Sequence, residues 1–397
     1  MFEKFTARFR SSDTNHRLLV PLLISTMLVQ LVTAMVRVTT SYRAVELDLS
    51  IVWLGLIAAT FAICPILIAV RVGRQIDRGY DAQTSWLGAV IFAFACTGFT
   101  FASSPVALLV ASTVMGTGHI MLMASQQMLC VRAAGPRSLE SVFGNYMVAG
   151  AIGQGIGPYV VGWVGGAASV PPTQTLFVIA AIISVLSFGV ALAMRPGPDK
   201  PLAKGASEIV PVRQIVRIPG LVAVVLAGVI LVSSSDIILI YIPLLGAERN
   251  IDVHAVGLLL TVRAAFSMVA RVFYARIVGI VGRWPLMIAS TFACGLSYAA
   301  FAAPLPLWAM HVSIAVMGFS FGLATTLSIT IVVDMTTAGA RGTTNSLRIM
   351  SNRVGQFVLP FGAGLVAAAA GLAGLFLILA VAIGGSAAAM AWRRPAA

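Results

Sequence analysis

Long apolar stretches separated by short polar segments recur along the whole chain. Each stretch is about 20 residues or longer with few charges, which is the length that an α-helix needs to cross ~30 Å of hydrocarbon. The apolar runs are continuous, whereas the strands of a membrane β-barrel alternate polar and apolar positions. The pattern therefore predicts an all-α, multi-pass membrane protein. The twelve predicted transmembrane helices are 18–41, 51–71, 84–103, 105–130, 139–165, 174–194, 218–246, 254–279, 284–303, 305–333, 343–371 and 372–392.

The composition excludes a soluble globular domain. Of the 397 residues, 59% are hydrophobic and 10% are charged, against about 25% charged in an ordinary soluble domain. The segment before Leu18 is polar and basic, and Leu18 begins a full-length span. We therefore expect no cleavable signal peptide.

The net charge of +13 is unevenly placed along the chain. Most Lys and Arg residues lie in the amino terminus, in the loops after even-numbered spans or in the carboxyl terminus. In the loops on the other face the basic residues are only Arg43 and Arg249. By the positive-inside rule, this asymmetry predicts a protein of the cytoplasmic (inner) membrane with both termini in the cytoplasm. The basic balance thus reflects topology, and we expect no nucleic-acid partner.

Signatures of catalysis and of cofactor binding find little support in the sequence. The cysteines have neither paired nor metal-ligand spacing. The sequence contains no nucleotide-binding loop, Gly-rich dinucleotide fingerprint or compact Ser/His/Asp cluster, and most spans lack any catalytic group. We therefore expect no cofactor, no metal and no enzymatic activity. The four cysteines are Cys64, Cys96, Cys130 and Cys294.

The chain repeats itself at an offset of 202 residues. This offset separates Gly153 from Gly355, Gly55 from Gly257, and the two "VMG" triplets at 114–116 and 316–318. Several landmarks at one offset indicate two six-helix halves in parallel repeat, an arrangement known in one large transporter fold. We predict halves at 1–194 and 218–397, joined by a Pro-, Gly- and charge-rich cytoplasmic linker at 195–217. Since one chain contains both halves, we expect it to function as a monomer.

The loop after the second span resembles the G-x-L-A-D-R-x-G-R-K signature of the major facilitator superfamily. Gly73, Asp77 and Arg78 match, and the weaker second copy retains Gly282 and Arg283. The residues that depart from the signature are Gln75, Tyr80, Asp81, Ala82 and, in the second copy, Gly279. The resemblance implies the superfamily fold and a latch that joins the halves in the outward-facing state, with its aspartate favoured by a helix dipole. Ordinary solvated loop charges are the alternative interpretation.

The fifth span resembles the G-x-x-x-G-P-x-x-G-G signature of the superfamily's exchangers and drug exporters. The matching residues are Gly153, Gly157, Pro158 and Gly162, and a weaker copy in span eleven keeps Gly355, Pro360 and Gly364. Small residues let helices approach closely, and a proline bends a membrane helix. The resemblance implies matching hinge helices and favours export. Glycines that serve packing alone are the alternative.

Ionisable residues inside a membrane are functional-site hypotheses by default. Arg263 lies about nine residues into span eight, hence ~14 Å deep, and Arg353 is similarly near the midplane of span eleven. Two such guanidinium groups could bind an anion bidentately, and basic residues on these two spans are similar to those of the superfamily's oxalate–formate exchangers. An internal ion pair is the alternative, but Asp236, the one carboxylate placed within a span, could neutralise only one arginine.

Other polar residues are weaker candidates. Arg37 either snorkels to the outer interface or lines the cavity. His119 is either a hydrogen-bonded core residue or a titrating group, and Gln356 faces the cavity or bonds a neighbouring helix. The superfamily's exporters often carry an arginine in span four where this chain has Ser112, which puts their usual scheme of proton coupling in doubt.

The sequence as a whole favours a secondary transporter that works by alternating access. We expect a small substrate, more readily anionic than cationic, moved outward in exchange for protons that Asp236 or His119 would carry. Alternatives are uptake or substrate-for-substrate exchange of an organic anion without protons, or export of a cationic or amphiphilic drug. A membrane enzyme or a receptor on the same fold is disfavoured, because the sequence has neither a catalytic cluster nor a soluble output domain.

Overall fold

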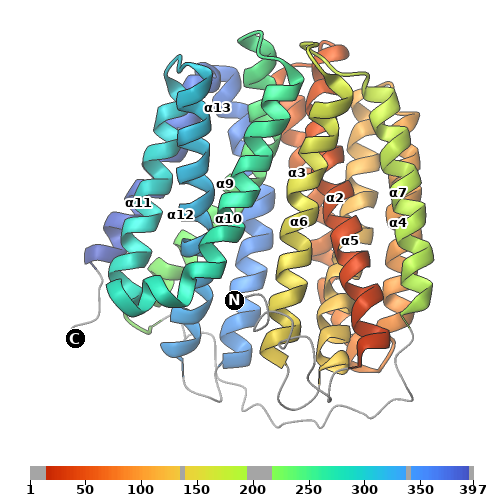
Figure 1. Ribbon diagram of the computed structural model, residues 1–397, viewed down its shortest axis with the longest axis vertical. Helices are drawn as coiled ribbons and strands as arrows, with labels where there is room; N and C mark the ends of the chain where they lie inside the picture. The colour runs from red at the N-terminus through yellow and green to blue at the C-terminus, as the bar shows by residue number, and fades with distance from the viewer. Residues whose placement is uncertain (1–14, 135–138, 195–216, 337–340, 393–397) are drawn as a thin grey trace, which may run out of the picture.

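A computed structural model describes residues 15–134, 139–194, 217–336 and 341–392, and in the part described the chain is all helix and connecting loop. The helices run roughly parallel to one long axis (Figure 1). They are α2 His16–Glu46, α3 Ile51–Asp77, α4 Asp81–Thr100, α5 Pro105–Ala133, α6 Leu139–Gly165, α7 Thr173–Ala193, α9 Leu221–Glu248, α10 Val253–Val281, α11 Arg283–Ala302, α12 Leu307–Asp334 and α13 Arg341–Trp392. All eleven helices in the described ranges are long and apolar enough to cross a membrane.

Helix α13 is two membrane spans in one. Its 52 residues would be ~78 Å long at 1.5 Å per residue, far more than a bilayer core requires. Gly371 interrupts it with φ 68° and ψ 179°, a conformation that an L-amino acid rarely adopts. The break falls where the sequence predicts the boundary between spans eleven and twelve, so the described helices supply twelve spans.

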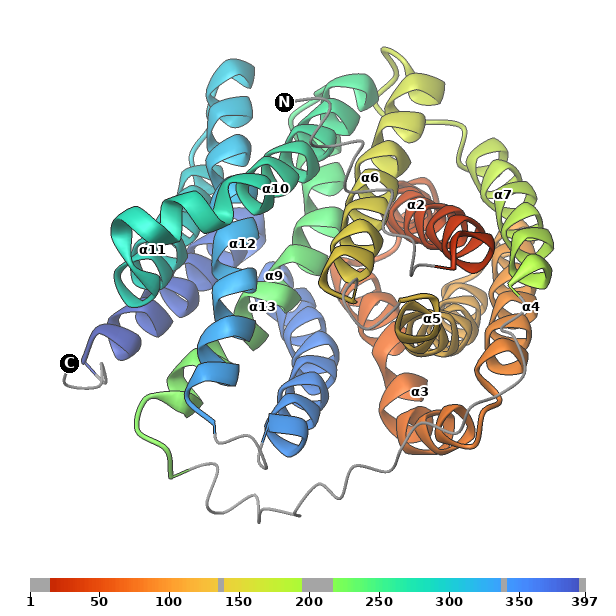
Figure 2. The same ribbon diagram turned by 60° about the horizontal axis from the view of Figure 1, so that its bottom comes forward.

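Helices α2–α7 form a first half of the molecule and α9–α13 a second half, which lie side by side in both views (Figures 1 and 2). Glycines allow equivalent close crossings in each half. A Cβ atom on Gly116 of α5 would lie 1.9 Å from the carbonyl oxygen of Phe61 on α3. A Cβ on Gly318 of α12 would lie 2.2 Å from the carbonyl oxygen of Arg263 on α10. Except for Arg217, the predicted linker lies outside the described residues.

The side on which α2 begins and α13 ends, which the sequence predicts to be cytoplasmic, is called the terminal face here; it is the lower side in Figure 1. The halves meet toward the opposite face. There the backbone N–H groups of Val253 and His254 donate to carbonyl oxygens of the α6–α7 loop, both at 3.0 Å. Deeper in, the Thr261 hydroxyl donates to the Gly155 carbonyl at 3.1 Å. Among the described residues, every hydrogen bond or ion pair between the halves lies at mid-membrane or nearer the opposite face.

Each half carries an ion pair on the terminal face, and the two pairs have opposite polarity. Asp81 at the start of α4 pairs with Arg132 near the end of α5. At the offset of 202 residues, Arg283 at the start of α11 pairs with Asp334 at the end of α12. The Asp81 side chain is fully buried, whereas both partners of the second pair are about half exposed. Asp81, which departs from the loop signature, thus forms its ion pair with Arg132 in the same half.

Removal of the buried carboxylate is expected to destabilise the protein far more than removal of its exposed counterpart. Asp81→Ala leaves the Arg132 charge with reduced compensation in a poorly hydrated site, which costs roughly 3 kcal/mol. Asp334→Ala breaks an exposed pair worth about 1 kcal/mol or less. Thermal unfolding of the two purified variants would compare these effects directly. Equal shifts in Tm would contradict the assignment of Asp81 to a structural role.

Candidate functional site

An ion pair joins the two halves at mid-membrane. The Arg37 guanidinium on α2 contacts the Asp236 carboxylate on α9 at 3.0 Å, and their side chains are only 13% and 19% exposed. Asp236 is twelve residues from the end of α9, or ~18 Å from that end. In this structure Arg37 therefore lies between the two halves and does not snorkel to the interface. A pair so far from bulk water is strong only if other hydrogen bonds complete it.

Gln356 completes the coordination of Asp236. Its side-chain amide donates to the second carboxylate oxygen of Asp236 at 2.8 Å. The Gln356 carbonyl oxygen in turn accepts a hydrogen bond from the Arg353 guanidinium at 3.0 Å, one turn away on α13. Arg353 is therefore linked to the carboxylate through an amide and forms no direct ion pair with it. Both oxygens of Asp236 are satisfied, and the Arg353 charge is only partly compensated.

Arg263 is bound to the residue that precedes Asp236 on α9. Its guanidinium donates to the Ser235 hydroxyl at 2.8 Å, and its central carbon lies 5.9 Å from the centre of the Phe321 ring. Arg263 is 4% exposed, so it packs among α9, α10 and α12 and does not project into an open cavity. The hydrogen bond to Ser235 joins two helices, so Arg263 reaches the site from the packed interior of the second half. Because Ser235 and Asp236 are adjacent, all three arginines are arranged about one turn of α9.

Around that turn of α9, positive charge exceeds negative charge. Arg37, Arg263 and Arg353 carry three positive charges, while Asp236 is the one carboxylate the structure places with them. The formal excess is two positive charges in a low-dielectric region. An uncompensated guanidinium there is costly, and an anionic ligand that accepted hydrogen bonds from it would relieve that cost.

A small cavity lies beside Arg37 on the side of the first half. It has about 30 Å³ available to water, enough for a single molecule. Arg37 also packs over the Phe61 ring, with its central carbon 4.4 Å from the ring centre. The cavity wall is mostly apolar, with Thr40 and Ser112 as polar exceptions. The Ser112 hydroxyl already donates a hydrogen bond to the carbonyl oxygen of Ile57 at 2.7 Å.

His119 is a buried polar group without a hydrogen bond. It is 7% exposed, and neither ring nitrogen has a partner among the described residues. Of the two interpretations, the hydrogen-bonded core histidine is therefore contradicted. The ring packs instead against Phe61, with centroids 5.2 Å apart and planes at 53°. An unsatisfied buried polar atom of this kind requires an explanation.

Two positions beside the site are repeated in the other half at the offset of 202 residues, but with different residue types. Phe61 and Arg263 are separated by 202 residues, and so are His119 and Phe321. The first half therefore packs an aromatic ring against a histidine, and the second half places an arginine over an aromatic ring. Phe61, Ser235 and Phe321 are not among the site residues that the sequence predicts. The repeat identifies the two aromatic residues, because each is the counterpart of a candidate polar residue.

Part of the predicted hinge set lies at close contacts between the halves. A Cβ on Gly162 of α6 would lie 3.2 Å from Gly257 of α10, and a Cβ on Gly257 would lie 2.6 Å from the carbonyl oxygen of Pro158. The repeat gives the second contact, in which a Cβ on Gly55 would lie 2.8 Å from the carbonyl oxygen of Pro360. Gly153 and Gly157 instead receive the backbone of α2 inside the first half. The first two glycines of the signature thus pack within the first half, whereas its proline and last glycine contact the second half.

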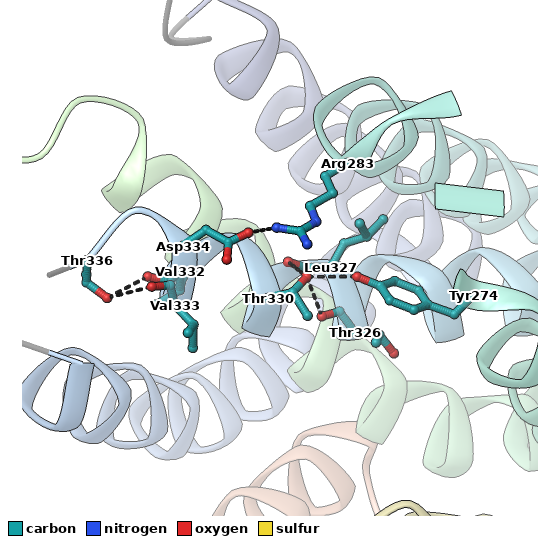
Figure 3. A network of polar contacts seen from close by, with 9 residues as sticks. All are labelled: Tyr274, Arg283, Thr326, Leu327, Thr330, Val332, Val333, Asp334 and Thr336. Atoms are coloured by element: carbon teal, nitrogen blue, oxygen red, sulfur yellow. Dashed lines mark hydrogen bonds and ion pairs between the residues drawn. The ribbon is translucent and has the colours of Figure 1, made fainter. Parts of the chain in front are cut away.

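The residues of the predicted latch are not engaged across the halves. Gly73, Asp77 and Arg78 lie at the end of α3 on the terminal face; Asp77 and Arg78 are exposed and have no ion-pair partner in the described ranges. Arg283 instead contacts Asp334 within the second half, beside the hydrogen bond between the hydroxyls of Tyr274 and Thr330 at 2.8 Å (Figure 3). A latch that closes only in the outward-facing state would be open in this arrangement.

The chain matches the family model of the Major Facilitator Superfamily over residues 22–248 and 224–397. No curated protein matches it. Similar solved structures include the nucleoside transporter NupG, at 16% identity, 96% coverage of this chain and 100% of the other, with a TM-score of 0.75. A bacterial homologue of the human lysosomal transporter Spinster, in an inward-facing and occupied conformation, has 16% identity, coverages of 96% and 97%, and a TM-score of 0.78.

A D-xylose–proton symporter is similar to the same extent, at 15% identity, with coverages of 96% and 98% and a TM-score of 0.77. At such identities these likenesses establish the fold alone. The substrates of these proteins therefore do not transfer to this chain.

Proposed function

The chain belongs to the major facilitator superfamily, a family of transporters rather than enzymes, and we propose that it carries a small organic anion across the cytoplasmic membrane. The observation that carries this proposal is the excess of positive charge around Asp236 at mid-membrane. Arg353 is the first binding group, because Gln356 is its one side-chain partner among the described residues and that amide is shared with Asp236. Arg263 adds positive potential from behind Ser235.

We propose that the structure is an inward-facing state with the terminal face in the cytoplasm. The supporting observations are the close contacts between the halves toward the opposite face and the disengaged loop residues Asp77 and Arg78. In this state an anion from the cytoplasm would reach Arg353 from the terminal face. Binding would compete with Asp236 for the Gln356 amide and loosen the link between the halves.

Proton exchange follows from the same carboxylate. Protonation of Asp236 would cancel its attraction for Arg37 and release the one described ion pair between the halves. For coupled exchange the anion and the proton would have to occupy the site in turn, since each of them releases a contact of Asp236 and so allows the halves to rearrange. Efflux agrees with the glycine and proline pattern of α6. Anion exchange without protons is the second candidate, favoured by the two positive charges that remain uncompensated.

Arg353→Gln is expected to weaken anion binding by a factor of roughly 30 to 150, because a charge-assisted bond worth about 2–3 kcal/mol is lost. Binding of a panel of mono- and dicarboxylates and phosphorylated metabolites to the purified protein would be measured by calorimetry. Arg276→Gln is the control, since this arginine is exposed at the terminal-face end of α10. Equal affinities in the two variants would overturn the assignment of Arg353.

A further inference from the structure

A groove between α3 and α4 lies away from the charged site, near the terminal face. It encloses about 370 Å³ and opens between the end of α3 and the first turns of α4. Its rim is polar, with Arg71 and Gln75 from α3 and Gln83 from α4. All three rim side chains are exposed. The transport cycle proposed above uses none of them.

The floor of the groove is apolar. Val72 and Met121 line it and are 7% and 8% exposed. They belong to a small hydrophobic cluster separate from the main core of the protein. Leu87 also lines the groove and is 54% exposed, and Leu67, four residues before Arg71 on α3, is 73% exposed. A polar rim above an apolar floor fits an amphiphilic ligand.

The charge at the rim is positive. Arg71, Arg74 and Arg78 are spaced three and four residues apart, so they share one face of α3. Asp77 lies six residues after Arg71, about 120° around the helix. In the part of the chain that the structure describes, Arg71 has no ion-pair partner. It lies about 9 Å before the end of α3, a depth from which an arginine reaches lipid phosphates.

The second half lacks this rim. At the offset of 202 residues, Arg71 corresponds to Phe273, Gln75 to Ile277 and Gln83 to Pro285. Each polar group is thus replaced by an apolar one, although the helices themselves are repeated. The polar rim is therefore not required by the architecture of a half and belongs to the first half alone.

We propose that this groove binds an anionic phospholipid from the leaflet at the terminal face. The lipid phosphate accepts hydrogen bonds from Arg71, with Gln75 and Gln83 completing its contacts. One acyl chain lies along Val72 and Leu87. Basic pockets between transmembrane helices are suited to such head groups. The bound lipid fills a region where α3 and α4 are joined by only a short loop.

The test uses the purified full-length protein in a neutral detergent, with Tm as the readout. Added phosphatidylglycerol is expected to raise Tm by roughly 3 °C, because a ligand that binds only the folded state stabilises it. Phosphatidylcholine and soluble glycerol phosphate are expected to have little effect. Arg71→Gln removes the rise, whereas Arg276→Gln, an exposed arginine at the equivalent end of α10, retains it.

A second variant tests the same rim independently, in case Arg71→Gln does not fold. Gln75→Leu/Gln83→Leu copies the apolar character of the second half at the rim and should also lose most of the rise in Tm. Three outcomes overturn the proposal: equal stabilisation of Arg71→Gln and Arg276→Gln, equal stabilisation by phosphatidylcholine, or equal stabilisation by glycerol phosphate alone. The last outcome would indicate a site for a soluble phosphate in place of a lipid.

Discussion

Asp236→Asn is expected to reduce transport at least about 100-fold while leaving the protein in the membrane. Asparagine keeps the shape of the side chain but removes the one negative charge that faces Arg37 and is linked to Arg353. Breaking one partner of a poorly hydrated charge pair costs about 3–5 kcal/mol. At 1.4 kcal/mol per factor of ten, that cost corresponds to two orders of magnitude or more.

The double variant Arg37→Gln/Asp236→Asn separates charge balance from proton transfer. It removes the buried arginine together with its partner, so folding stability should return toward that of the unaltered protein. Exchange of substrate for substrate should recover in part, whereas proton-driven flux should not. Both fluxes would be measured in liposomes with an internal pH dye. Full proton-driven flux in the double variant would contradict the role of Asp236 as proton carrier.

Gly55→Val/Gly257→Val is expected to lower transport below about a tenth by preventing closure of the opposite face. A Cβ on Gly257 would lie 2.6 Å from the Pro158 carbonyl oxygen, and a Cβ on Gly55 would lie 2.7 Å from the Cα of Gly364. In both cases the obstacle is backbone of the other half. The halves must therefore separate where they now touch, which stabilises the outward-facing state relative to the inward-facing one.

Crosslinking would measure this change directly. In a background without the native cysteines, Ala168→Cys and Val253→Cys place two thiols where the backbones are hydrogen-bonded at 3.0 Å. Disulfide formation between these two cysteines should be fast in the protein that retains Gly55 and Gly257 and slow in the Gly55→Val/Gly257→Val variant. Gly189→Val is the matched control, because a Cβ there has no neighbour within 4 Å. Unchanged crosslinking in the valine variant would contradict the hinge hypothesis and would indicate that these glycines serve packing alone.

The repeated architecture was predictable because its signals are regular. Span lengths depend on bilayer thickness, and the offset of 202 residues preserves several close glycine contacts, such as that of Gly116 with its counterpart at Gly318. The break between the last two spans was also predictable in position, although its cause, the positive φ of Gly371, is not visible in hydropathy.

The partners of the charged residues were less predictable. Depth along a helix placed Arg37 near the outer end of its span, but which charge faces Asp236 depends on how α2 and α9 pack across the halves. The rotation of α10 likewise buries Arg263 against Ser235 and Phe321. Hydropathy and spacing contain no information on such rotations. For the same reason the sequence could not show that the ring of His119 lacks a hydrogen-bond partner.

The central claim is that the excess positive charge at mid-membrane selects an anion, and flux through purified protein in liposomes tests it most directly. A panel of carboxylates, phosphorylated metabolites and cationic dyes would be added under an imposed proton gradient. We predict that particular anions evoke proton movement and that Arg263→Ala/Arg353→Ala abolishes it, while Arg276→Gln does not. Proton movement evoked only by cations, and retained in the double variant, would contradict the account.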